Sequence, residues 1–461
     1  MSIWIPHHLL VDTTIKDKIA KDLTVIQLDE TYEAMKKQGR IMPGYTVDPN
    51  KKIYVFDMDE HDNIHLPYYY ARHILEIKGL PLSPKIDNYP KFSSKIENHS
   101  VLRENQIETA KICLNHLREK GTTTVGLPPG YGKTYIGAHL SFLLGLKVAV
   151  IVPREPLLKQ WAATFKSALP AASQWIVGKG KVPDVMPDIT IVLDPRISKI
   201  PEEWRSQIGT LIIDEAHMIP TRSRISNLLS IQPAYIIMET ATMVRGDNLH
   251  LICHLVGGDH GVFMTAKDPY TFNIVDLGFI NAEERVGPMG VDYTNLCCSL
   301  SEIEEYNRAI LNIVKQHSNN KFIILTRRVE HGAALVKMFR ENDISADTMM
   351  GTKKSYVNSR VLIGTFSKIG TGFDEKTSSA SVFKGNVSDS LILCHSVKKE
   401  ANFEQFRGRV MRTDNPTIYW LNVGNKTIRS HLRPIKKHVD ATGGTICHQS
   451  GKRYMFSSCS E

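Results

Sequence analysis

The chain has 461 residues, of which 42% are hydrophobic and 23% charged, and its formal net charge is +9. This length exceeds what one hydrophobic core usually holds, so two or three domains are expected. No apolar run approaches the ~20 residues that span a membrane, and residues 1–8 lack the basic and apolar segments of a secretory signal. The composition therefore excludes a membrane protein and indicates an intracellular, soluble one.

The net positive charge favours a polyanionic partner, although many basic proteins bind no polyanion. Seven cysteines are scattered along the chain, and their odd number is typical of reduced thiols. Cys253 lies near three histidines, but it lacks the paired spacing of a zinc site. Buried or surface thiols are the favoured interpretation.

Residues 1–96 hold no chemical motif and are expected to form a small N-terminal α+β domain. The run 53–57 is rich in β-branched and aromatic residues, which predicts a strand, and residues 64–67 are its predicted return strand. A helix is predicted at 68–78. The polar stretch 85–100, which contains a proline, suits a linker to the next domain.

A helix is also predicted at 102–119, where apolar residues recur at helical spacing. Short apolar runs then alternate with helix-like segments. Runs that are apolar throughout are typical of strands buried on both faces, as in a parallel sheet covered by helices. These runs are 122–126, 148–152, 189–193, 211–213 and 235–238.

The same pattern restarts after a less regular stretch, which predicts a second α/β lobe. Its apolar runs are 322–325, 361–363, 391–394 and 418–421. The predicted fold class is therefore α/β, with two tandem lobes built on parallel sheets and a small N-terminal α+β domain. The predicted divisions are an accessory domain at 1–96, a first lobe at 97–275, a second lobe at 276–435, and a basic, at most partly ordered tail at 436–461.

The segment 126–134 reads Gly-Leu-Pro-Pro-Gly-Tyr-Gly-Lys-Thr and lies between a strand run and a helix-like run. Its inner glycines let backbone N–H groups turn toward phosphate, and the following helix N-terminus adds partial positive charge. The lysine would reach the β- and γ-phosphates of ATP, and the threonine hydroxyl would bind Mg²⁺. The expected ATP-binding residues of this loop are Pro129, Gly130, Gly132, Lys133 and Thr134.

The quartet Asp214-Glu215-Ala216-His217 follows the apolar run 210–213. Asp214 is expected to hold the Mg²⁺ of bound ATP, and Glu215 to polarise the attacking water as a general base. A solvated strand end is the alternative interpretation. The phosphate-binding loop upstream in the same predicted lobe favours the catalytic one.

The ordered set of elements resembles the superfamily 2 helicases and translocases of the DEAH-box type, over about residues 100–425. That resemblance implies that Gln106 reads the adenine, and that the two lobes are RecA-like. Thr240-Ala241-Thr242 resembles the element that couples the ATP site to the nucleic-acid path, and His217 is assigned to the same coupling. Glu239 departs from the family pattern, which has an apolar or small residue there.

The predicted second lobe carries two further elements of this family. Residues 371–374 resemble the segment that contacts both ATP and the phosphate backbone. Residues 405–412 match the pattern Gln-x-x-Gly-Arg-x-x-Arg, whose arginines would act as arginine fingers on the γ-phosphate. The residues implied are Gly372 and Asp374 for ATP, Gln405 for coupling, and Arg409 and Arg412 for catalysis.

The form of the two ATP motifs resembles the branch that contains DNA-repair, phage recombination and large-DNA-virus transcript-release helicases. The resemblance implies ATP and Mg²⁺ as cofactors and nucleic acid as the partner, with DNA favoured over RNA and movement from 3′ to 5′. It also implies a monomer that works beside a polymerase or other replication or transcription machinery. The expected location is the cytoplasm, the nucleus or the virion. A nucleic-acid-binding ATPase switch without strand displacement is the alternative. A P-loop kinase or a one-lobed ATPase would have no use for the second lobe or its arginines.

Overall fold

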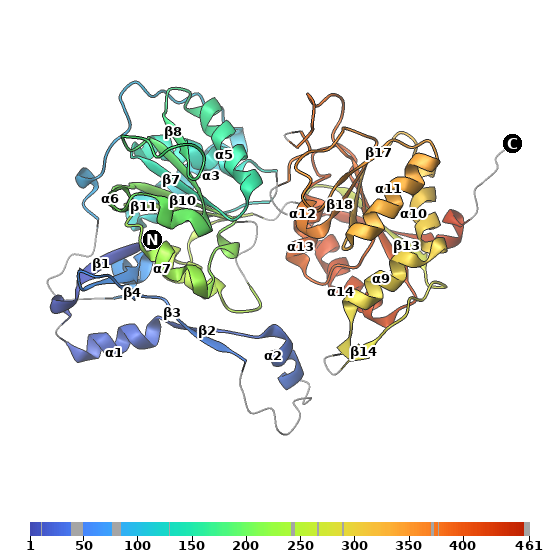
Figure 1. Cartoon of the computed structure of the whole chain (residues 1–461), viewed down its shortest axis with the longest axis horizontal. Helices are drawn as coiled ribbons and strands as arrows, with labels where there is room; N and C mark the ends of the chain where they lie inside the picture. Colours follow the sequence, from blue (N-terminus) through green and yellow to red (C-terminus); the bar gives the residue numbers. More distant parts are fainter. Residues whose placement is uncertain are drawn as a thin grey trace. The chain divides into compact units, whose positions relative to one another are not determined.

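The computed structural model describes residues 1–10, 12–37, 49–75, 84–128, 130–240, 245–264, 267–287, 290–369, 373–376 and 378–455. The chain folds as two compact units (Figure 1). The first unit consists of Met1–Leu127 and Tyr131–Met264, and the second of Pro128–Gly130 and Thr265–Glu461. Within the described ranges, no helix is long and apolar enough to cross a membrane.

The first unit is built on a seven-stranded parallel sheet in the order β12-β6-β11-β10-β7-β9-β8. Its strands are β6 (Thr122–Gly126), β7 (Val148–Val152), β8 (Gln174–Ile176), β9 (Ile189–Leu193), β10 (Thr210–Asp214), β11 (Tyr235–Thr240) and β12 (Gly261–Phe263). Its helices are α3 (Glu104–Lys120), α4 (Lys133–Leu144), α5 (Glu155–Ala168), α6 (Glu202–Arg205), α7 (Ile225–Leu229) and α8 (His250–Gly257).

Successive residues of one strand enter opposite cores of this unit. Val150 packs with the helices α3, α4 and α5, whereas Ile151 packs with α6, α7 and α8. Both faces of the sheet are therefore dry. This is the physical reason why the sequence runs are apolar throughout instead of alternating.

The second unit repeats this architecture with a seven-stranded parallel sheet in the order β17-β18-β16-β19-β20-β13-β21. Its strands are β13 (Tyr270–Leu277), β16 (Phe322–Thr326), β17 (Ala346–Met349), β18 (Val361–Thr365), β19 (Ser390–Leu393), β20 (Thr417–Val423) and β21 (Gly444–Ser450), and a small hairpin pairs β14 (Val286–Gly287) with β15 (Gly290–Val291). The helices are α9 (Tyr293–Glu302), α10 (Glu304–Gln316), α11 (Val329–Glu341), α12 (Phe366–Ile369), α13 (Glu400–Arg407) and α14 (Lys426–Ala441). The predicted α/β fold with two parallel sheets is confirmed.

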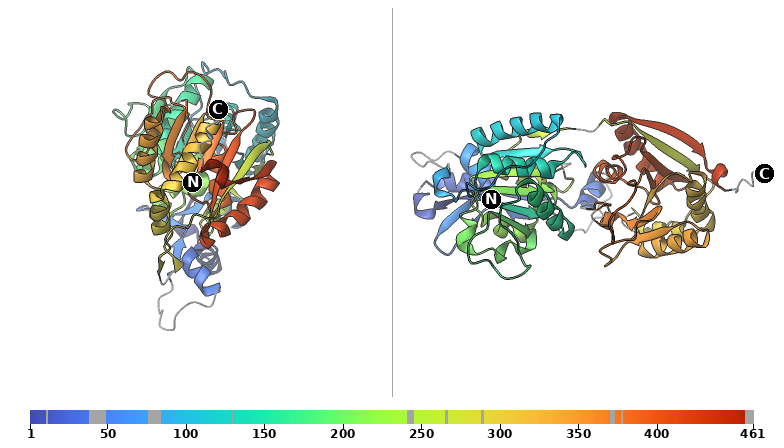
Figure 2. Two further views of the ribbon diagram at one scale, coloured as in Figure 1. Left: turned by 90° about the vertical axis from the view of Figure 1, so that its right-hand side faces the viewer. Right: turned by 90° about the horizontal axis from the view of Figure 1, so that it is seen from above.

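The second sheet differs from the sequence prediction at its edge. Strand β13 starts before the predicted boundary at 275, and β21 lies inside the predicted tail. These two strands pair with each other and run side by side in the sheet (Figure 2). Asn273 interrupts the apolar run of β13, because its side chain accepts a hydrogen bond from Gln449 of β21 at 2.9 Å. β21 is half exposed, as an edge strand is, so it shows no apolar run. The expectation of a tail that is at most partly ordered is wrong for residues 436–455.

An N-terminal module, which we define as residues 1–75, packs within the first unit against the helices of its parallel sheet. It holds a sheet of order β1-β5-β4, a ribbon of β2 and β3, and two helices. These elements are β1 (Ser2–Pro6), α1 (Thr13–Asp22), β2 (Thr24–Gln27), α2 (Glu30–Lys37), β3 (Lys51–Tyr54), β4 (Asp57–Met58) and β5 (Asn63–Pro67). The predicted strand 53–57 is thus split in two, and the predicted helix 68–78 is a short π-helical turn, Tyr70–Ile74, in its described part.

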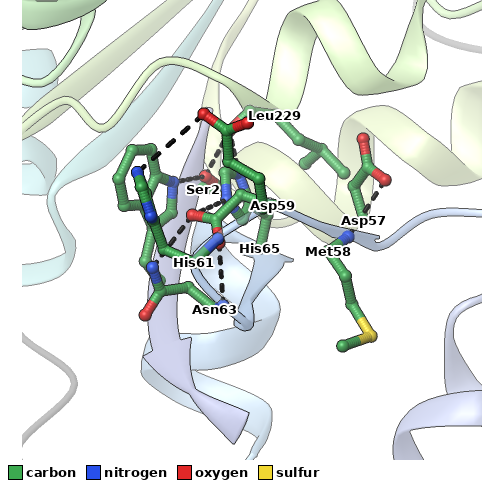
Figure 3. A network of polar contacts seen from close by, with 10 residues as sticks. Ser2, Asp57, Met58, Asp59, His61, Asn63, His65 and Leu229 are labelled. Carbon is green, nitrogen blue, oxygen red and sulfur yellow. Dashed lines mark hydrogen bonds and ion pairs between the residues drawn. The ribbon is translucent and has the colours of Figure 1, made fainter.

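The N-terminal module is attached by a shared core and by a polar network. Its apolar side chains form one cluster with Leu229 of α7 and with Ile252 of α8. The Ser2 hydroxyl donates to the carbonyl oxygen of Leu229, and a ring nitrogen of His65 lies 3.3 Å from the same oxygen (Figure 3). The other ring nitrogen of His65 lies 3.1 Å from Asp59. The module is therefore fixed to the rest of the first unit at the end of α7.

Candidate ATP site and coupling residues

The loop between β6 and α4 has the backbone of a phosphate-binding loop. Gly130 and Gly132 have φ angles of 83° and 93°, a region that side chains other than glycine rarely adopt. A Cβ on Gly132 would lie 2.3 Å from Nε2 of Gln106, so glycine is also required there for space. Lys133 begins α4, and its Nζ donates to the carbonyl oxygen of Leu127 at 2.8 Å. The ammonium group is therefore held over the loop.

Gln106 lies against this loop from α3. Its Oε1 accepts the backbone N–H of Arg103 at 2.8 Å, which caps the helix, and its Nε2 donates to the carbonyl oxygen of Tyr131 at 2.6 Å. The guanidinium of Arg103 donates to the same carbonyl and lies 5.8 Å from the Tyr131 ring. Arg103 was not predicted as a site residue, and its place three residues before Gln106 is the only signal for it in the sequence.

The carboxylate pair lies at the carboxyl end of β10. Asp214 is 5% exposed. Its Oδ2 accepts a hydrogen bond from Nε1 of Trp161 and its Oδ1 accepts one from the backbone N–H of Glu215, each at 2.9 Å. Burial raises the pKa of Asp214, and the neighbouring Glu215 carboxylate adds to the rise. Glu215 has a φ of 48°, a strained conformation for a residue with a side chain. Gln160, beside the fully buried Trp161, lies 3.5 Å from the hydroxyl of Thr134.

His217 connects the carboxylate pair to β11. Its Nδ1 lies 2.8 Å from the hydroxyl of Thr240 and 3.6 Å from Oε2 of Glu215. Burial, together with the nearby positive charge of Arg245, lowers the pKa of His217 to about 4, so the ring is neutral at neutral pH. A neutral ring can exchange a hydrogen bond with Thr240. The structure therefore brings the predicted base and two predicted coupling residues into contact.

Glu239 is a third buried carboxyl beside this pair. It is 0% exposed and lies in register with Asp214 on the neighbouring strand. A Cβ on Gly137 of α4 would lie 2.4 Å from Oε1 of Glu239, so the glycine makes room for the carboxyl. Burial and the Asp214 carboxylate raise the pKa of Glu239 well above its usual range. Glu239 is therefore protonated and uncharged in the folded protein. This explains how an acid can occupy a position where the family pattern has an apolar or small residue.

The second unit gathers its own predicted residues around residues 373–374. Arg409 donates to the carbonyl oxygen of Phe373, and Arg412 forms an ion pair with Asp374. Arg407 is 1% exposed and binds Glu404 through two hydrogen bonds, at 3.0 and 2.6 Å. Arg407 thus supports α13 from within, which leaves the other two arginines as the accessible ones. Gln405 lies on α13.

Three predicted site residues, Pro129, Thr242 and Gly372, lie outside the described residues. For Mg²⁺, the donors at hand are the carboxylate of Asp214 and the hydroxyl of Thr134, which are the oxygen ligands that this ion prefers. The buried carboxyl of Asp214, whose pKa burial raises, fits such an ion, because a cation would stabilise its charged form. In the described part of the chain, no group of three or more His, Cys, Asp or Glu side chains could hold a metal ion by itself.

Comparison with known proteins shows what the chain is similar to. Residues 99–245 match the protein family described as "Type III restriction enzyme, res subunit". The chain is 28% identical over 389 residues to "Putative helicase 161L" of Invertebrate iridescent virus 6. The matched region covers 77% of this chain and 85% of that protein. It is 26% identical over 170 residues to "DNA 3'-5' translocase XPB2" of Sulfurisphaera tokodaii, 37% of this chain and 36% of that protein.

These matches relate the chain to the superfamily 2 helicases and translocases. Its fold is also that of the Saccharomyces cerevisiae protein Dbp5, solved with RNA and ADP BeF3, with a TM-score of 0.55 and 10% identity over 75% of this chain and 90% of that one. The two parallel sheets are therefore tandem RecA-like lobes. The protein is an ATP-dependent hydrolase that acts on nucleic acid.

Proposed function

We propose that this superfamily 2 protein is a motor that moves along DNA, or unwinds it, at the expense of ATP. The contact between His217 and Thr240, beside Glu215, carries the proposal. It places the proposed base of hydrolysis one side chain away from the strand that leads to the proposed nucleic-acid path. A nucleotide-binding protein whose ATP site does not communicate with nucleic acid would have no need of that connection.

In the proposed reaction, ATP binds with its phosphates on the loop and on the N-terminus of α4. Lys133 leaves the carbonyl of Leu127 for the β- and γ-phosphates, and Glu215 orients and deprotonates the attacking water. Mg²⁺ held by Thr134 and Asp214 would neutralise the phosphate charge that develops in the transition state. Gln106 would read the adenine from beside the loop.

The second unit would supply the remaining positive charge. Arg409 and Arg412 are proposed as arginine fingers, since delocalised guanidinium charge suits the transition state of phosphoryl transfer. Before ATP arrives, Asp374 neutralises Arg412. The γ-phosphate would have to compete with this carboxylate. Hydrolysis would then end the competition and return Arg412 to Asp374 in each cycle.

Movement along a strand requires only contacts to the phosphate backbone, which are independent of sequence. The chain offers a net charge of +9 and a basic surface on α14 for such contacts. The basic residues of that helix are Lys426, Arg429, Arg433, Lys436 and Lys437. We favour DNA and 3′ to 5′ movement, as the name of the Sulfurisphaera relative states for that protein. RNA is the alternative substrate, in line with the RNA bound to Dbp5.

Two measurements test the proposal. The rate of ATP hydrolysis should rise with single-stranded, duplex or branched DNA more than with RNA, and stimulation by RNA alone would contradict the preference for DNA. Lys133→Ala and Glu215→Gln should each abolish turnover while the protein stays folded, and full activity in either variant would refute the site.

The second candidate is an ATPase switch or scaffold that binds nucleic acid without displacing a strand. The ion pair between Arg412 and Asp374 supports this second candidate. An arginine that leaves Asp374 for the γ-phosphate when ATP binds suits a switch as well as a motor. Strand displacement on a tailed duplex separates the two, since only a motor releases the strand. The monomeric state, a polymerase partner, the intracellular place of action and a role in transcript release stay predictions.

A further inference from the structure

The turn 245–249, which follows β11 in the chain, is tied to the backbone of the loop that carries His217. Arg245 binds both carboxylate oxygens of Asp247, at 2.9 and 2.7 Å, and donates a further hydrogen bond to the carbonyl oxygen of His217. A guanidinium can hold a carboxylate and a carbonyl together, because its five N–H groups form a rigid planar fork. The side chain of Arg245 thus fixes the position of His217 relative to this turn.

The N-terminal module contacts the same turn from its other side. The backbone N–H of Leu28, between β2 and α2, donates to the carbonyl oxygen of Asp247 at 3.1 Å. A Cβ on Gly246 would lie 2.6 Å from Oε1 of Glu30, so glycine lets α2 approach the turn closely. Leu249 also packs into the core cluster that contains Val25 of β2.

The polar network at Leu229 fixes the module a second time (Figure 3). Leu229 ends α7, the helix that follows the carboxylate loop in the chain, while the turn 245–249 follows the strand that carries Thr240. The N-terminal module therefore contacts two segments. One follows His217 in the chain and the other follows Thr240, and these are the two residues of the proposed coupling contact.

We infer that the N-terminal module positions His217 for coupling, with Leu28 acting through Asp247 and Arg245. The inference rests on the proposed function, because it concerns how nucleic acid stimulates ATP hydrolysis. Leu28, Asp247 and Arg245 are positioning residues, since none of them touches ATP. Loss of the contact should free the His217 loop and weaken the stimulation, while ATP hydrolysis in the absence of nucleic acid continues.

The test compares Leu28→Pro with Leu28→Ala in the full chain. Proline removes the N–H that Asp247 accepts, and Gln27 before it lies in a strand, the conformation that a residue preceding proline prefers. Alanine keeps the N–H and removes only the side chain, so it is the matched control for packing. Stimulation of kcat by nucleic acid should fall about fivefold in Leu28→Pro, the size expected for one net hydrogen bond. It should change less than about twofold in Leu28→Ala, as should the unstimulated rate in both.

A second variant, Arg245→Gln, decides the case in which Leu28→Pro does not fold. It should lower the stimulation by itself. Where Leu28→Pro does fold, adding it to Arg245→Gln should lower the stimulation little further, because both changes break one chain of contacts. Full stimulation in folded Arg245→Gln, equal losses in both Leu28 variants, or independent losses in the double variant would overturn the inference. A wild-type chain that nucleic acid does not stimulate would instead overturn the proposed function, and the inference with it.

Discussion

Glu239→Gln should raise the free energy of unfolding of the first unit, and the gain should grow with pH. Glu239 is 0% exposed, and neither of its carboxyl oxygens has a hydrogen-bond partner among the described residues. Burial and the neighbouring Asp214 raise its pKa well above the usual range. At neutral pH, the folded protein therefore keeps a proton that the unfolded chain has lost.

The sign and size of the effect follow from this proton. Above the ordinary glutamate pKa, unfolding releases it, so a rise in pH favours the unfolded wild-type chain by about 1.4 kcal/mol per pH unit until the folded pKa is reached. Glutamine has the same shape but carries no such proton. The difference in unfolding free energy between variant and wild type should therefore widen by up to about 2.7 kcal/mol from pH 5 to pH 7.

Urea unfolding followed by tryptophan fluorescence measures this difference. Trp420 is the only one of the five tryptophans in the second unit, so Trp420→Phe in both proteins confines the signal to the first unit. Glu203→Gln, at an exposed position on α6, is the matched control and should leave the stability nearly unchanged at both pH values. A difference that stays constant or shrinks between pH 5 and pH 7 would show that Glu239 is ionised in the folded protein.

Three further predictions concern the rest of the site. Trp161→Phe removes the indole donor that favours the Asp214 carboxylate, so the pKa of Asp214 should rise, and the acid limb of the pH profile of kcat/KM for ATP should move to higher pH; an unmoved limb would contradict it. Arg407→Gln removes the buried guanidinium that pairs with Glu404, whose carboxylate keeps its contact with His438, and should destabilise the second unit by about 3 kcal/mol, read from Trp420 fluorescence. Arg433→Gln combined with Lys437→Gln should reduce the slope of log affinity for duplex DNA against log salt by up to about 1.8, whereas Lys337→Gln on α11, which pairs with Glu341, should leave the slope unchanged.

The sequence by itself determined the repeated sheet and the identity of the ATP motifs. Strands buried on both faces, such as β7 and β10, must be apolar throughout, so they can be recognised from a single sequence. A phosphate-binding loop needs glycines and a lysine at fixed spacing, which makes residues 126–134 equally visible. Edge strand β21 and the interrupted β13 gave no such signal, because half-exposed or side-chain-bonded strands need no continuous apolar run.

Only the tertiary structure decided which polar residues meet. Arg245 and His217 are far apart in the sequence, as are Leu28 and Asp247, and no local pattern links either pair. The arginines of residues 405–412 look alike in the sequence, yet burial beside Glu404 gives Arg407 a structural role and leaves Arg412 for Asp374. Periodicity reports how a segment meets the core, but a hydrogen bond between distant segments depends on the path of the whole chain.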